Sequence, residues 1–231
     1  MSATPQKIVI LDFGSQTTQL IARRIREQRV YSEIPPYTLP LERLRAMQPK
    51  GIVLSGGPAS VYDGDAPSSD PGIFALGVPI LGICYGAQLM MHQLGGQIES
   101  AEKREFGKAE LAIQRPDRLF AGLAPEPSRH QVWMSHGDRI TAPAPGFVIS
   151  ATSVHSPAAA LEHAEKPFFA LQFHPEVAHT AIGTDILKNF IFNICGCEPS
   201  WTVQSFIETS VAAIRARVGQ GKVICALSGG V

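Results

Sequence analysis

The first half of the chain alternates between short apolar runs and segments with helical periodicity. Residues 7–14 (KIVILDFG) form an apolar run that ends in a glycine, as a buried strand does. In residues 16–29, Leu20, Ile21 and Ile25 share one face of a predicted helix whose other face is charged. The alternation continues with predicted strands at 30–34, 51–57 and 78–84, and predicted helices at 40–47 and 85–96. Continuous apolar strands separated by helices predict an α/β fold: an open, mostly parallel sheet with helices on both faces.

From about residue 97 the pattern changes to short runs separated by Pro, Gly and Asp, which predicts an added antiparallel portion. The predicted strands are 108–113, 131–136, 147–153, 158–164 and 168–174. A helix is expected at 180–195, a second at 201–219 and a further strand at 222–227 (KVICAL), followed by SGGV. We therefore expect residues 1–197 to form one domain and residues 198–231 to be the start of a truncated second domain.

Composition excludes several classes of protein. Lys plus Arg and Asp plus Glu both number 20, so the balanced charge argues against a nucleic-acid surface. The apolar run near the N-terminus is too short for a signal peptide or a membrane span. Four cysteines without a dense framework fit a reducing cytoplasm, the location that we expect. Cys195 and Cys197 lack a second Cys/His pair nearby, so we expect no metal site.

Cys84 has a setting that the other cysteines lack. The sequence GICYG follows a predicted strand and precedes a predicted helix, which is the thiol version of a nucleophile elbow. Gly82 and Gly86 would remove side chains that collide with such a turn, and the start of a helix favours a thiolate. The Tyr85 backbone N–H could form half of an oxyanion hole. From this stretch alone, a buried cysteine packed at a tight junction is an equally good interpretation.

Two further motifs favour a nucleophile. The glycine pair in LSGGPASVY bares backbone N–H groups at the sheet edge, and Gly57 could supply the second oxyanion donor. In FFALQFHPEV, His174 ends a predicted strand and Glu176 lies two residues on, where its carboxylate could orient the imidazole. A zinc deaminase would need a P-C-x-x-C half and a zinc protease an H-E-x-x-H helix, and the sequence has neither around His174.

The motifs GICYG, SGGP and QFHPE together resemble the class I (triad-type) glutamine amidotransferase family, whose sheet is flavodoxin-like. The resemblance implies hydrolysis of L-glutamine to glutamate and ammonia, and roles for individual residues. It implies Cys84 as nucleophile, His174 as base, Glu176 as its orienter, Gly57 and Tyr85 as oxyanion donors, and Gln88, Ser135, Gly137 and Asp138 as glutamine-binding residues.

Stretches such as KREFGKAEL, VWMSHGD and WTVQSFIE extend the resemblance to one member of the family, which transfers ammonia to ATP-activated XMP. The resemblance implies no cofactor in this chain, but ATP and Mg²⁺ for a longer, homodimeric enzyme. Ser228, Gly229 and Gly230 resemble the start of that enzyme's nucleotide-binding loop. Three alternatives remain: an amidotransferase for anthranilate or carbamoyl phosphate synthesis, a γ-glutamyl peptide hydrolase, and a catalytically inactive regulatory or docking module.

Overall fold

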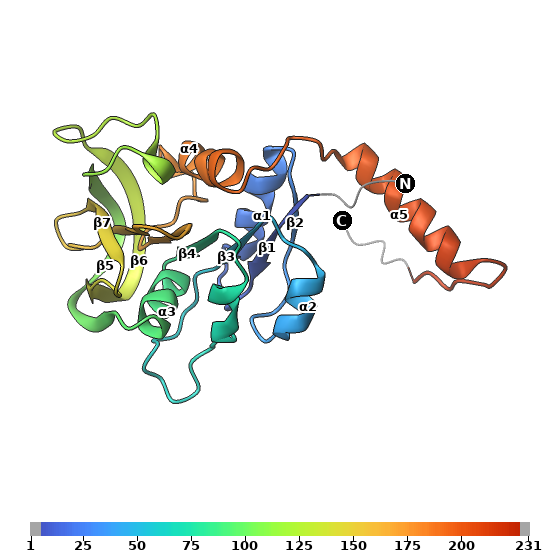
Figure 1. The fold of residues 1–231 in the computed structure, drawn as a ribbon, viewed down its shortest axis with the longest axis horizontal. Coiled ribbons are helices and arrows are strands. Elements are labelled where there is room, and N and C mark those ends of the chain that lie inside the picture. The colour runs from blue at the N-terminus through green and yellow to red at the C-terminus, as the bar shows by residue number, and fades with distance from the viewer. Residues whose placement is uncertain (1–5, 227–231) are drawn as a thin grey trace.

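A mixed sheet of nine strands runs through residues 6–226, the part of the chain that this computed structural model describes, with the side chains of 101–104 left out. Its strand order is β2-β1-β3-β4-β9-β8-β7-β5-β6 (Figure 1). The parallel half comprises β1 (Lys7–Leu11), β2 (Tyr31–Glu33), β3 (Gly51–Leu54), β4 (Ile80–Ile83) and β9 (Phe168–Leu171). The predicted α/β fold is therefore confirmed.

Helices cover both faces of the parallel strands, as the apolar runs predict. Along β1, Ile8 and Ile10 belong to the core under helices α1 (Thr18–Glu27) and α4 (Gly183–Lys188), whereas Val9 and Leu11 face the opposite core. That second core lies beneath α2 (Leu41–Ala46) and α3 (Tyr85–Gln93). Figure 1 shows the two pairs of helices on opposite sides of the sheet. Because successive strand residues point to opposite faces, a strand covered on both sides must be apolar throughout.

The antiparallel portion extends the same sheet. It comprises β5 (Gln97–Ile113), β6 (His130–Ala142), β7 (Phe147–Thr152) and β8 (Ala160–His163). Strands β5 and β6 pair with each other along most of their length, with register shifts between Gln97 and Ile98 and between Ser100 and Glu105. The predicted antiparallel addition is confirmed, and it places β6 beside the segment that follows β9.

Short helices complete the described chain. Two 3₁₀ helices, η1 (Pro71–Ala75) and η2 (Arg118–Phe120), lie in connecting segments, and α4 runs on into a π-helical turn, η3 (Asn189–Ile194). The helix predicted at 180–195 is thus confirmed.

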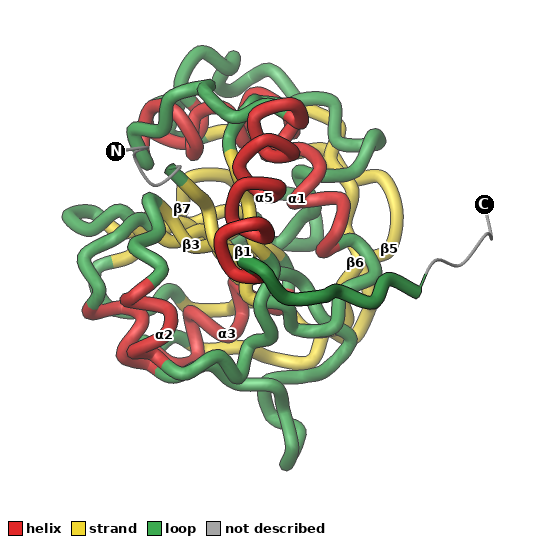
Figure 2. Tube along the Cα trace, turned by 90° about the vertical axis from the view of Figure 1, so that its right-hand side faces the viewer, coloured by secondary structure: helices red, strands yellow, loops and turns green. Residues whose placement is uncertain are grey.

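Helix α5 (Val203–Val218) is also confirmed, but it buries none of its residues and extends away from the sheet (Figure 1). In the view of Figure 2 it lies in front of the sheet. The strand predicted at 222–227 is wrong over its described part, because residues 222–226 pair with no strand of the described chain. An apolar β-branched run becomes a strand only where a neighbour completes the hydrogen-bond ladder. Ser228, Gly229 and Gly230 lie outside the described residues, and the boundary at 197/198 stays a prediction.

Candidate active site

Cys84 occupies the turn between strand β4 and helix α3. Its φ of 53° lies in the left-handed region, which residues other than glycine rarely adopt. A Cβ at position 82 would lie 2.7 Å from the carbonyl oxygen of Gly86, and one at position 86 would overlap the backbone of Leu54. The predicted need for glycine on both sides of Cys84 is therefore confirmed. Local strain of this kind is typical of functional positions.

His174 and Glu176 lie in the segment that follows β9. The prediction that the strand ends at His174 is wrong, because β9 ends at Leu171 and bends follow at residues 172–173 and 175–177. The Nδ1–H group of His174 nevertheless donates a hydrogen bond of 2.7 Å to Oε1 of Glu176, and both side chains are buried. The predicted contact is confirmed, but a bent rather than an extended backbone brings the two groups together.

Three other parts of the fold hold this segment in place. The His174 N–H donates to the Trp133 carbonyl on β6 at 3.0 Å, and the Thr180 hydroxyl donates to the His174 carbonyl at 2.6 Å. From helix α1, Nε of Arg24 donates to the Glu176 carbonyl at 2.9 Å. The main chain on either side of the imidazole is thus fixed before any substrate binds, as catalytic positioning requires.

The imidazole and the thiol meet above Gly56. A Cβ built on Gly56 would lie 3.2 Å from Cε1 of His174 and 3.6 Å from Cβ of Cys84. Burial acts to lower the pKa of His174, but hydrogen bonding to Cys84 and Glu176 and the charges of both groups raise it from 6.5 to about 10. The raised pKa makes the ring a base that can take and hold the thiol proton at neutral pH.

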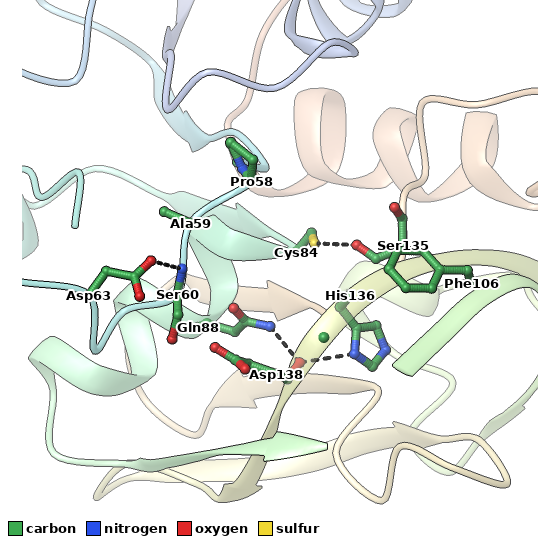
Figure 3. A pocket seen from close by; sticks show the side chains of 12 residues that line it. Pro58, Ala59, Ser60, Asp63, Cys84, Gln88, Phe106, Ser135, His136 and Asp138 are labelled. Atoms are coloured by element: carbon green, nitrogen blue, oxygen red, sulfur yellow. Dashed lines mark hydrogen bonds between the residues drawn. The ribbon is translucent and has the colours of Figure 1, made fainter. Parts of the chain in front are cut away.

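Cys84 also faces a hollow of about 480 Å³, which we call the Asp138 hollow. Its walls include all four residues expected to bind glutamine: Gln88 from α3, and Ser135, Gly137 and Asp138 from β6. Gln88 is only 3% exposed, and its Nε2 donates to the Asp138 carbonyl at 2.8 Å (Figure 3). The Cys84 thiol donates to the Ser135 carbonyl at 3.3 Å. The structure thus brings the four residues together, while their roles stay predictions.

Of the two expected oxyanion donors, Gly57 lines the same hollow and Tyr85 directly follows Cys84 in the chain. Tyr85 is the first residue of α3, so its N–H has no acceptor within the helix. Gly57 lies in the loop that follows β3 and lines the hollow beside Cys84. The Tyr85 hydroxyl donates to the Pro67 carbonyl at 2.5 Å, and burial raises the pKa of this phenol to about 12, so it remains a donor. This bond anchors the loop between β3 and η1.

Six residues of the Asp138 hollow carried no role in the sequence analysis: Pro58, Ala59, Ser60, Asp63, Phe106 and His136. The His136 ring donates from Nδ1 to the Asp138 carbonyl at 2.9 Å, and its Nε2 lies 3.3 Å from a Glu105 carboxylate oxygen on β5. His136 lies in the stretch VWMSHGD and Phe106 in KREFGKAEL, so the resemblance of these stretches to the family could have indicated both residues. No local pattern marks Asp63, because only the folded loop brings it to the hollow.

The remaining sequence predictions concern metals and membranes. Among the described residues, no group of three or more His, Cys, Asp and Glu side chains is arranged to hold a metal ion. Cys195 and Cys197 are buried, which raises the pKa of both thiols. No helix of the described chain has both the length and the apolar character needed to cross a bilayer.

Known proteins resemble this chain over most of its length. The family model for glutamine amidotransferase class-I matches residues 9–194. The GMP synthase [glutamine-hydrolyzing] of Desulfotalea psychrophila is 64% identical over all 231 residues, and that of Heliobacterium modesticaldum 54%. The chain spans 45% and 44% of these relatives, less than half of their length.

Solved structures give the same result. A protein from Thermoplasma acidophilum, described provisionally as one component of GMP synthase, matches with a TM-score of 0.71 and 30% identity, covering 90% of this chain and 98% of that one. A glutamine amidotransferase from Thermotoga maritima, 18% identical, shares the fold with a TM-score of 0.60, covering 91% and 92% of the two chains. The region matched by the family model contains the cysteine turn, the His174–Glu176 pair and the Asp138 hollow. The chain belongs to the class I glutamine amidotransferase family.

Proposed function

We propose that this chain hydrolyses the side-chain amide of glutamine, with Cys84 as nucleophile, His174 as acid and base, and Glu176 as the group that orients the imidazole. One observation carries the proposal. A cysteine held at positive φ faces a hollow on one side and a buried, carboxylate-bound imidazole on the other. Nucleophilic catalysis by a thiol requires a sulfur that borders the substrate site and a base held in position beside it.

Acylation begins with proton transfer from Cys84 to His174, which the raised pKa of His174 favours at neutral pH. The thiolate then attacks the side-chain carbonyl carbon of glutamine, and the N–H groups of Tyr85 and Gly57 stabilise the oxyanion. When the carbon–nitrogen bond breaks, the imidazolium donates its proton to the nitrogen, and ammonia leaves. A γ-glutamyl thioester on Cys84 remains.

Deacylation reverses these roles. His174 takes a proton from water as the water oxygen attacks the thioester carbon, and the carbon–sulfur bond then breaks to release glutamate. Glu176 holds one tautomer of the ring throughout, because its carboxylate accepts from Nδ1 and leaves Nε2 to exchange protons.

The Asp138 hollow suits the amino acid end of glutamine. The carboxylates of Asp63 and Asp138 provide negative charge for the α-ammonium group, and both residues line the hollow. Gln88 ties the Asp138 main chain to helix α3 and so fixes one wall of the site. Ser135 and Gly137 contribute main-chain groups on the same strand.

We further propose that the ammonia serves GMP synthesis, since the curated relatives named above are GMP synthases more than twice as long as this chain. Their additional length would use ATP and Mg²⁺ to activate XMP, and would complete a nucleotide loop that begins at Ser228, Gly229 and Gly230. Residues 198–231 would then begin that second domain. A homodimer and a cytoplasmic location remain predictions.

Substitution of Cys84 by alanine tests the catalytic proposal. We expect the rate of glutamate release to fall by several powers of ten, because a nucleophile and its base act together and loss of either removes the effect of both. The matched control is Cys225→Ala, which removes an exposed thiol from the chain and should leave the rate unchanged. Labelling with a glutamine-mimicking electrophile should be lost only in the Cys84 variant. Equal glutaminase rates in wild type and Cys84→Ala would end the assignment.

A further inference from the structure

Two hollows meet at Cys84. The Asp138 hollow lies on one side, and a second hollow of about 400 Å³, which we call the His174 hollow, lies on the other. They share four residues: Gly57, Pro58, Cys84 and Ser135. Both hollows therefore border the Cys84 sulfur, although a single bound amino acid would occupy only one of them.

The two hollows differ in the chemistry of their walls. The Asp138 hollow has the carboxylates of Asp63 and Asp138, which suit the charged end of an amino acid. Apart from the parts that the two share, the His174 hollow is lined by the loop between β1 and α1, and by His174, Trp133 and Val177. Its only ionisable lining side chains are those of Cys84 and His174, so no carboxylate, Lys or Arg side chain of the described residues lines it.

The loop that borders the His174 hollow comprises Gly14, Ser15, Gln16 and Thr17. The hydroxyls of Ser15 and Thr17 are 2.8 Å apart, and the Thr17 N–H donates to Ser15 Oγ at 3.1 Å. Gly14 and Gln16 are exposed, so this side of the hollow reaches the surface. Neutral hydroxyl and amide groups can exchange hydrogen bonds with small molecules such as water without holding an ion.

The proposed reaction needs a second opening beside the sulfur for small molecules. While the γ-glutamyl thioester exists, the amino acid remains in the Asp138 hollow and obstructs it. Ammonia must leave and water must arrive during that time, and both exchange a proton with the His174 imidazole. Since that imidazole lines the second hollow, we propose that the His174 hollow is the passage through which ammonia leaves and hydrolytic water reaches the thioester.

This inference rests on the proposed function, and narrowing the passage tests it. Gln16→Trp places a bulky side chain at the exposed border of the His174 hollow, and Thr17→Phe does so one residue deeper. The matched control is Gln19→Trp, because Gln19 is exposed on α1 and does not line either hollow. Each variant is first compared with wild type by circular dichroism and urea unfolding.

Two measured rates distinguish an effect on the passage from an effect on the substrate site. The rate of Cys84 labelling by a glutamine-mimicking electrophile reports access through the Asp138 hollow. Rapid quenching with radiolabelled glutamine reports the level and decay of the thioester. Added hydroxylamine, a nucleophile close to ammonia in size, attacks the same carbonyl carbon, displaces the Cys84 thiolate and gives γ-glutamyl hydroxamate.

In Gln16→Trp and Thr17→Phe, we expect thioester decay in water and hydroxamate formation to slow by roughly tenfold or more while labelling stays near the wild-type rate. The thioester should therefore accumulate. Gln19→Trp should behave as wild type. Thioester decay at the wild-type rate in both folded variants, or an equal loss of Cys84 labelling and thioester decay, would overturn the proposal. Failure of the proposed function looks different: wild type itself would form no thioester and Cys84 would take no label.

Discussion

Gly183, at the start of helix α4, offers a sharp test of how the fold positions the catalytic histidine. A Cβ at this position would lie 2.8 Å from the carbonyl carbon of Pro175 and closer still to its oxygen, whereas ordinary contacts of this kind begin at 3.4 Å. Pro175 stands between His174 and Glu176 in the chain. The first turn of α4 therefore packs directly against the backbone that carries the proposed triad.

Helix propensity and packing predict opposite signs for Gly183→Ala. On propensity alone, alanine would stabilise the helix by at most about 1 kcal/mol. The overlap instead forces helix and turn apart by roughly 1 Å, and overpacking of this kind costs about 1 to 3 kcal/mol. Because a shift of that size at a catalytic group costs on the order of 100-fold in rate, the packing effect should dominate activity as well as stability.

Urea unfolding would measure the change in stability, and glutamate release together with Cys84 labelling would measure the effect on the site. The control is Gly64→Ala, because a Cβ at Gly64 meets no atom within 4 Å. We expect Gly183→Ala to unfold at lower urea concentration and to lose activity, and Gly64→Ala to do neither. A Gly183→Ala protein as stable and active as wild type would refute the close packing of α4 on this turn.

Three further predictions follow from burial and charge. Glutamate release should fall as the pH rises through about 10, because deprotonated His174 has no proton for the leaving ammonia. Alkylation of Cys84 should persist over the same range. A rate of glutamate release that is unchanged up to about pH 11 would contradict this prediction. Iodoacetamide at about pH 8 should modify Cys84 but spare Cys195 and Cys197, whose pKa values burial raises, as peptide mass spectrometry would show. Asn189→Ala should cost roughly 2 kcal/mol or more in urea unfolding, because two carbonyl groups lose their buried donor; Asn193→Ala, with a single side-chain bond to that residue, should cost clearly less.

Much of the fold follows from local pattern. The apolar run around β1 predicts a strand and the periodicity of α1 predicts a helix. The two patterns differ because a strand buried on both faces is apolar throughout, whereas an amphipathic helix is apolar on one face only. The same reasoning misplaced the end of β9 and predicted a strand over residues 222–226. Both errors concern where an apolar segment stops pairing, which depends on a neighbouring strand and not on the segment itself.

Within the candidate site, the sequence by itself determined the cysteine turn and the short-range partnership of His174 with Glu176, because each lies within a few residues of chain. Only the tertiary structure decided that the Cys84 turn and the His174 bend meet above Gly56, that β6 brings Asp138 to Gln88, and that Arg24 reaches the Glu176 carbonyl across 152 positions. Local periodicity records which face a residue buries. It does not record which distant segment covers that face, because that depends on the order in which the strands pair.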